Sequence, residues 1–204
     1  NIVFLIWSFL IVGLAAYPLG ILSGCMGASY FLRKQGHQST IASCLKIVLP
    51  KAFPLWTFFW IDGWITVNQI LNRLPKKRYR TNSFLQELLY FSWKLGTIGI
   101  LPAILNGKNL IDAGKESILL VKDHPKEALL LRGGYSLCCW IVGISAYIGA
   151  ILSFIYYGNL FGKEHEIYTF YFWMGIPILV AVAIVLFFLR PIFIIASCAF
   201  YTNY

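Results

Sequence analysis

Three charged side chains stand inside otherwise apolar segments, and they are the residues best placed for chemistry. Asp62 interrupts the apolar run at 52–71, whereas Glu87 and Lys94 lie in the run at 84–105. Because an ionised side chain at the centre of a bilayer costs at least about 2.5 kcal/mol, such residues usually pair or line a pathway. Glu87 and Lys94 are two helical turns apart, so they share a helix face but are too distant for direct contact. We therefore expect Lys94 to pair with Asp62.

These three residues support two interpretations. They form either a polar binding site or pathway, or a structural salt bridge with charges close enough to the interface to reach the headgroups. A polar cavity lined by all three would favour transport, and buried pairs beside lipid-filled grooves would favour a structural role. The residue pattern leaves both interpretations open.

No other group of residues specifies a reaction. The sequence has no H-E-x-x-H, G-x-S-x-G, P-loop or dinucleotide-binding motif. The three histidines lie in separate polar segments, as His37, His124 and His165. The cysteines lack C-x-x-C spacing, so we expect buried free thiols at Cys25, Cys44, Cys138, Cys139 and Cys198. We expect no metal site, no cofactor and no catalytic activity.

Composition predicts a membrane protein. Hydrophobic residues make up 59% of the 204 positions and charged residues 12%, compared with about 25% charged residues in soluble domains. Several separate apolar runs predict an all-α, polytopic transmembrane helix bundle with about five spans. The net charge of +9 then indicates topology and anionic lipid headgroups, and not a nucleic-acid partner. We expect a single helical membrane domain over 1–204 that lacks N-terminal residues, because it begins inside an apolar run without Met.

Two stripes of small residues recur at four-residue spacing. Such stripes let another helix approach closely in lipid. We expect helix packing along both stripes, of which the first consists of Ala16, Gly20, Gly24 and Ala28 and the second of Ser145, Gly149 and Ser153.

Residues 39–51 predict a short amphipathic helix in the membrane interface. Ile41, Cys44, Leu45, Val48 and Leu49 follow helical spacing, and Ser39 or Thr40 is available as the N-cap. We expect Pro50 and Pro54 to end this helix before the next segment.

The run at 52–71 has basic residues on both sides, which the positive-inside rule disfavours for a crossing helix. It either crosses the membrane with Asp62 facing the bundle, or enters and returns through a turn at Asp62-Gly63. Its length favours a crossing. Further along the chain, Pro125 is suited to the first position of a new helix. We expect Arg190-Pro191 to end a span at 167–189, and the tail at 193–204 to lie in the interface or pack on the bundle.

Lysine and arginine content predicts the orientation. The loop at 158–166 has one basic residue, whereas the segments 107–134 and 33–51 have five and four. The positive-inside rule then places 158–166 outside the cytoplasm and both amphipathic segments inside. In a prokaryote the membrane would be the cytoplasmic (inner) membrane. The basic run at 73–80 fits only if the segments between 52 and 105 half-penetrate the membrane.

Several short motifs accompany this order of segments: Trp93, Thr97 and Pro102, then Ala113 and Glu116-Ser117, and later Ala199 and Tyr201. With them the chain resembles a family of uncharacterised prokaryotic membrane proteins with six spans, whose first span would precede Asn1. The run at 52–71 is more distantly similar to the half-penetrating helices of sulfate-permease-like proteins. These resemblances imply an architecture and no assigned activity.

Two functions agree with these features. The first is a non-enzymatic subunit or scaffold of a larger membrane assembly, with lipids and other membrane proteins as partners. The alternative is a transporter or channel for a lipid or small anion that uses Asp62, Glu87 and Lys94 or the basic cytoplasmic surface.

Overall fold

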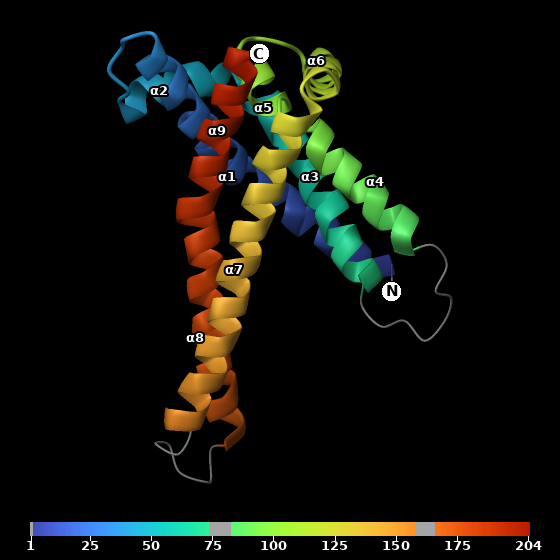
Figure 1. Ribbon diagram of the computed structural model, residues 1–204, viewed down its shortest axis with the longest axis vertical. Helices are drawn as coiled ribbons and strands as arrows, with labels where there is room; N and C mark the ends of the chain where they lie inside the picture. Colours follow the sequence, from blue (N-terminus) through green and yellow to red (C-terminus); the bar gives the residue numbers. More distant parts are fainter. Residues whose placement is uncertain (1, 74–82, 158–165) are drawn as a thin grey trace. The chain divides into compact units, whose positions relative to one another are not determined.

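The computed structural model describes residues 2–73, 83–157 and 166–204, and all regular structure in these ranges is helical (Figure 1). Within these ranges, five helical segments are long and apolar enough to cross a membrane. The predicted all-α class with five possible spans is confirmed. The elements are α1 (Ile2–Lys34), α2 (Ile41–Val48), the 3-10 turn η1 (Leu49–Lys51), α3 (Ala52–Arg73), α4 (Ser83–Gly96), α5 (Ile100–Leu105), α6 (Leu110–Asp123), α7 (Pro125–Tyr157), α8 (Glu166–Ile184), the π-helical turn η4 (Val185–Leu189) and α9 (Arg190–Asn203).

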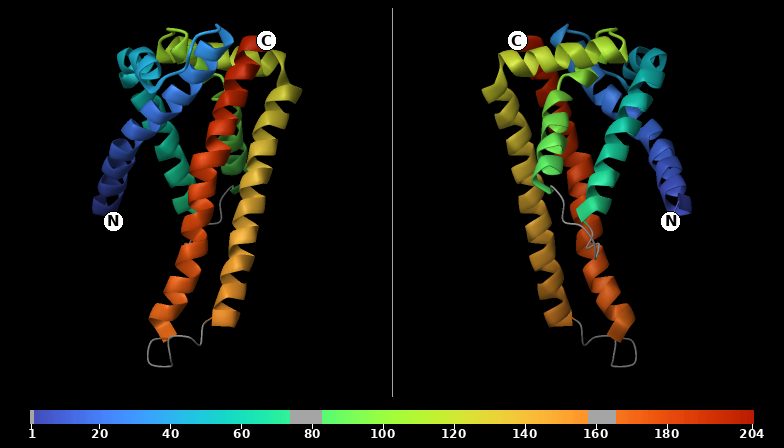
Figure 2. Two further views of the ribbon diagram at one scale, coloured as in Figure 1. Left: turned by 90° about the vertical axis from the view of Figure 1, so that its left-hand side faces the viewer. Right: turned by 90° about the vertical axis from the view of Figure 1, so that its right-hand side faces the viewer.

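The chain divides into two compact units, whereas the sequence predicts one domain. The first unit comprises Asn1–Arg132 together with Ile194–Tyr204, and the second comprises Gly133–Phe193. Within the first unit, α2, α5 and α6 lie at one end of the longer helices, and α6 runs across that end (Figures 1 and 2). The core of this unit is closed by side chains with no exposed surface, among them Ala28, Val48, Leu55, Ile104 and Cys198.

The first small-residue stripe lies in close helix contacts. Ala16 and Ala28 are buried, and a Cβ added at Gly24 would lie 2.9 Å from Val48 Cγ1 and 3.0 Å from Leu55 Cδ1. Glycine therefore lets α1 approach the segment from α2 to α3 closely. The contact surface is wider than predicted, because a Cβ at Gly27 would lie 2.5 Å from a side-chain carbon of Leu105 on α5.

Aromatic side chains of α3 fill the opposite side of this contact. Trp56 and Trp60 stack with ring centroids 4.8 Å apart. The Trp56 indole donates to the Gly13 carbonyl at 2.8 Å, and the Trp60 indole donates to the Phe9 carbonyl at 3.2 Å. Both carbonyls belong to the part of α1 that precedes Pro18. Large rings on α3 thus pack closely against α1, where glycine and alanine leave room beside the backbone.

Helix α2 begins at a capping box. Thr40 is the N-cap, as one of the two predicted candidates: its side chain accepts from the Ser43 N–H, and the Ser43 hydroxyl accepts from the Thr40 N–H. The helix ends before Pro50, as predicted, but η1 continues directly into α3. The prediction that Pro54 ends a helix is wrong. Pro54 lies in the first turn of α3, where its missing N–H has no helical partner to lose.

Helix α3 runs without interruption through Asp62 and Gly63. The alternative of a re-entrant turn at these two residues is therefore excluded. A Cβ at Gly63 would lie 2.8 Å from Val12 Cγ1, so this glycine serves close helix packing and not a turn.

The predicted end of a helix at Arg190-Pro191 is also wrong. Helix α8 passes through η4 into α9, which contains Pro191 near its start. Because proline lacks an N–H and crowds the preceding turn, the backbone widens into a π turn and the helix continues. The tail does pack on the bundle, since Ile194, Ser197, Cys198 and Phe200 are buried.

In the second unit, α7 and α8 form a helical hairpin whose predicted packing stripe is open. Ser145 is exposed, and no atom lies within 4 Å of a Cβ added at Gly149. The residue of α7 that is most buried here is Ala150, with 1% exposure. Within the second unit, Ser145 and Gly149 of this stripe thus pack against no other helix. Packing against another chain stays a prediction.

Candidate functional site

The predicted pair of Asp62 and Lys94 is present between α3 and α4. Lys94 Nζ donates to both carboxylate oxygens of Asp62, at 2.5 Å and 2.6 Å. The two side chains are 11% and 23% exposed, in the order Lys94 and Asp62. The contact joins α3 to α4. In the sequence these two helices are connected by residues 74–82, which lie outside the described ranges.

Two aromatic residues of α4 complete this site. The Trp93 indole N–H donates to Asp62 Oδ1 at 3.1 Å, and Lys94 Nζ lies 5.6 Å from the centroid of the Tyr90 ring. The carboxylate therefore accepts three hydrogen bonds, and the ammonium gains a cation–π contact. Both kinds of contact stabilise charge where water is scarce. The site is an ion pair with no net charge, and both charged groups have contacts with protein groups.

Glu87 is exposed on α4, one helical turn before Tyr90. It has an interaction of its own, whereas the contacts described above join Asp62 and Lys94. The structure thus brings together two of the three predicted intramembrane residues. A binding role for any of the three stays a prediction.

A groove of about 360 Å³ lies beside the pair, between α3, α4, α5 and α6. Trp93 connects the groove to the ion pair, because it lines the groove and its indole N–H donates to Asp62. The remaining lining is mostly apolar, including Phe58, Ile61, Ile100 and Ile118, with Lys115 as its one charged residue. The charged atoms of Asp62 and Lys94 do not line this groove, so the groove is suited to hydrocarbon.

The break between α4 and α5 is closed by a serine of α6. Ser117 is fully buried, accepts from the Gly99 N–H at 2.8 Å and donates to the Gly96 carbonyl at 2.6 Å. A Cβ at Gly99 would lie 3.2 Å from Ser117 Cα, so glycine is needed there for the two helices to touch. The hydroxyl satisfies two backbone groups that the helix break would leave buried without partners.

A second polar cluster ties α6 to α9. Tyr201 donates to Glu116 Oε1 at 2.9 Å, and Lys108 Nζ lies 3.0 Å from Glu116 Oε2. The contact with the Glu116 carboxylate raises the pKa of Lys108 above its usual range. This cluster fixes the C-terminal helix on the charged helix α6.

Among the described residues, no group of three or more His, Cys, Asp or Glu could hold a metal ion. The His124 ring packs on Tyr204, with centroids 4.2 Å apart, and His165 lies outside the described ranges. The cysteines are free as predicted, but only Cys44 and Cys198 are buried, and Cys138 is exposed. The expectation of burial was wrong for Cys138 because it lies on an outer face of α7.

The sequence did not predict the hydrogen bonds of Trp93, Ser117 and Tyr201. These residues belong to the motifs of the family resemblance, but their types and spacing suggest no partner for any of them. Searches against protein-family models, curated proteins and solved structures found no match. The resemblance to six-span prokaryotic proteins therefore stays a prediction.

Proposed function

We propose that this chain is a non-enzymatic subunit or scaffold of a larger membrane assembly, in which α7 binds helices of partner proteins. The observation that carries the proposal is the free space beside Gly143 and Gly149 of α7. Within the second unit, no atom outside the backbone of α7 itself lies within 4 Å of a Cβ placed at Gly143 or Gly149. In lipid, glycine on a helix surface is the usual site of close helix–helix approach.

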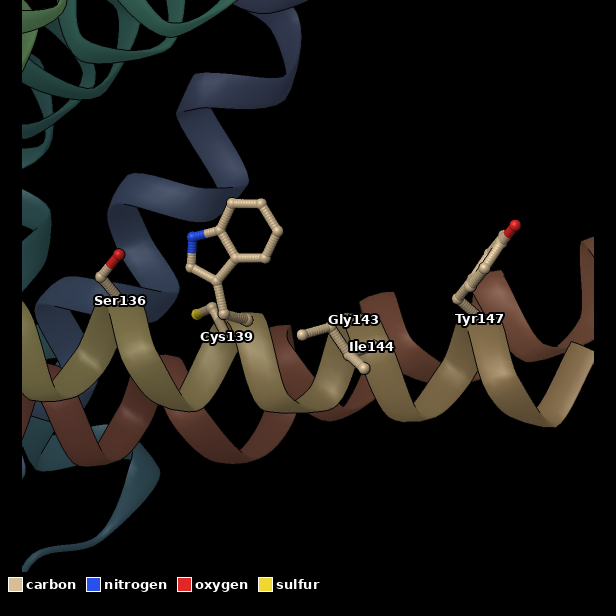
Figure 3. Close-up of a pocket in the computed structure, with 6 residues that line it drawn as sticks. Ser136, Cys139, Gly143, Ile144 and Tyr147 are labelled. Atoms are coloured by element: carbon tan, nitrogen blue, oxygen red, sulfur yellow. The ribbon is translucent and has the colours of Figure 1, made fainter.

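These two glycines lie on different faces of α7. One face holds Ser136, Trp140, Gly143 and Tyr147, and a hollow of about 460 Å³ lies along it. Figure 3 shows Tyr147 projecting from α7 beyond Gly143, so the glycine is a gap beside a large ring. The other face is the stripe of Ser145, Gly149 and Ser153. A ring beside a gap suits the interlocking of side chains from a neighbouring helix.

A third face of α7 has the character of a lipid contact. It consists mainly of exposed aliphatic side chains, namely Leu137, Ile141, Ile148, Ile151 and Ile155.

The intramembrane charges support an assembly role over transport. Asp62 and Lys94 form a closed pair, and the neighbouring groove has a mostly apolar lining. This arrangement corresponds to the structural alternative, in which charges are retained to join helices. A transport path would need polar groups that face an aqueous or substrate-filled cavity.

The test compares bulky substitutions on the three faces of α7. In mild detergent extracts from native membranes, native electrophoresis should show the chain in a complex. Gly143→Leu or Gly149→Leu should release it, because a leucine on either face prevents close approach. The matched control, Ile141→Phe with Ile148→Phe, adds bulk on the aliphatic face and should leave the complex intact.

Two results would overturn the proposal. One is a chain that migrates alone in every mild detergent, with no dependence on either glycine. The other is flux of an anion or lipid through proteoliposomes of the purified chain that is lost in Asp62→Asn. That second result would establish the transport alternative.

A further inference from the structure

The segment from α2 to the start of α3 has an apolar stripe on its outer side in addition to its buried one. Cys44, Val48 and Leu55 are buried against the core. In contrast, Ile41 is 82% exposed, Leu49 53% and Phe53 72%. Together with half-buried Leu45, these residues recur every four positions and form a continuous line, which we call the outer stripe. A two-turn helix does not need a second apolar face to pack on the bundle.

The stretch of sequence that contains the outer stripe carries charges of one sign. No Asp or Glu occurs before Asp62, whereas Arg33, Lys34, Lys46 and Lys51 all fall within this region. Lys34 and Lys46 are exposed. Lys51 is already engaged, since it donates to the Leu105 carbonyl at the end of α5. Lys34 and Lys46, both exposed and in the same stretch of sequence, are therefore available for anions.

The position of α2 puts this surface at a membrane boundary. Helix α1 is long enough to cross a bilayer and ends in Arg33 and Lys34. Gly36, with φ of 77°, then reverses the chain, and α2 lies at that same end of α1 (Figure 1). The Arg33 side chain donates to Ser39 and so holds the reversal together.

We propose that the outer stripe inserts into the headgroup region of a leaflet rich in anionic phospholipid, with Lys34 and Lys46 binding the lipid phosphates. Apolar side chains beside a basic flank are the signature of helices that lie in the interface of anionic membranes. A protein partner with an acidic, apolar surface would satisfy the same chemistry less well, because the stripe stands at the end of a spanning helix. The proposal is independent of the assembly role of α7.

Depth and lipid dependence can be measured on the whole chain. An environment-sensitive fluorophore is attached at Ile41→Cys, with Cys25, Cys138 and Cys139 replaced by Ala and the buried cysteines left in place. The protein is placed in nanodiscs of phosphatidylcholine with or without phosphatidylglycerol. With phosphatidylglycerol, lipids that carry a nitroxide near the headgroup should quench the fluorophore strongly, and aqueous iodide should quench it weakly.

Charge substitutions then separate lipid binding from simple burial. Lys34→Gln and Lys46→Gln should each weaken the phosphatidylglycerol-dependent quenching, at about five-fold in apparent affinity per lysine, which corresponds to about 1 kcal/mol. The control pair Lys122→Gln and Lys126→Gln removes equal charge from exposed lysines that have Asp123 and Glu127 beside them, and should have no effect. Iodide quenching without lipid quenching would overturn the proposal, as would equal lipid quenching with and without phosphatidylglycerol.

Discussion

Lys94 Nζ binds both carboxylate oxygens of Asp62, 32 positions earlier in the chain, and so joins α3 to α4 through one two-pronged contact. The pair is largely hidden from solvent. Its charges are therefore weakly screened, and removing one partner leaves the other without compensation.

The first prediction concerns this pair. Lys94→Met should lower the free energy of unfolding in detergent by about 3–5 kcal/mol, and Asp62→Asn combined with Lys94→Met should recover part of that loss. The control is Lys115→Met, which breaks the exposed pair of Lys115 with Asp112 and should cost no more than about 1 kcal/mol. Strictly additive effects in the double-mutant cycle would show that Asp62 and Lys94 do not interact in the folded protein.

The second prediction concerns the helix break. Ser117→Ala removes the partner of the Gly99 N–H and of the Gly96 carbonyl. Since each buried group left without a partner costs about 1–3 kcal/mol, the variant should unfold at a clearly lower denaturant concentration. Ser92→Ala is the matched control, because Ser92 is exposed on α4. Similar stability of both variants would mean that water replaces the Ser117 hydroxyl.

The third prediction separates two kinds of glycine. Gly24→Ala should destabilise the folded chain by about 1–3 kcal/mol, because the new methyl group overpacks a full contact with Val48 and Leu55. Gly149→Ala should leave thermal stability of the isolated chain unchanged or raise it slightly, since the site is open and alanine favours helix. Equal losses at both positions would contradict the assignment of α1 to internal packing and of α7 to external packing.

The fourth prediction concerns pH. The pKa of Lys108 is raised by its contact with Glu116, so the charged form is favoured in the folded state. Stability from this contact is present below the usual lysine pKa of about 10.4 and is lost as pH rises through the higher folded pKa. The melting temperatures of wild type and Lys108→Met should therefore differ at neutral pH and converge in strong alkali. A difference that persists there would assign the effect to the packing of the Lys108 chain.

The sequence predicts contacts in this fold where a physical penalty is large. A lone charge in an apolar segment must find a partner, so the pair of Asp62 and Lys94 could be anticipated. Repeated glycine at four-residue spacing likewise pointed to the packing face of α1. In both cases the pattern is local and its energetic reason is strong.

Other features depend on relations that residue types do not reveal. Ser117 occurs on an amphipathic helix where serine is unremarkable, and its role exists only because α6 passes the break before α5. The continuation of α8 through Pro191 reflects a small change in backbone pitch that competes closely with a helix end. The division into two units depends on contacts between distant segments, which periodicity does not encode.

The Ser117 contact has a consequence for the order of events during synthesis. The backbone groups of Gly96 and Gly99 are made first, and the hydroxyl that binds the Gly99 N–H follows 18 residues later. At roughly 5–20 residues per second on the ribosome, these groups wait about one to four seconds for their partner. Until then, α4 and α5 are joined by an unsatisfied hinge that prefers water or the insertion machinery to lipid. Insertion of this segment into the bilayer is therefore more favourable after α6 has been synthesised than before.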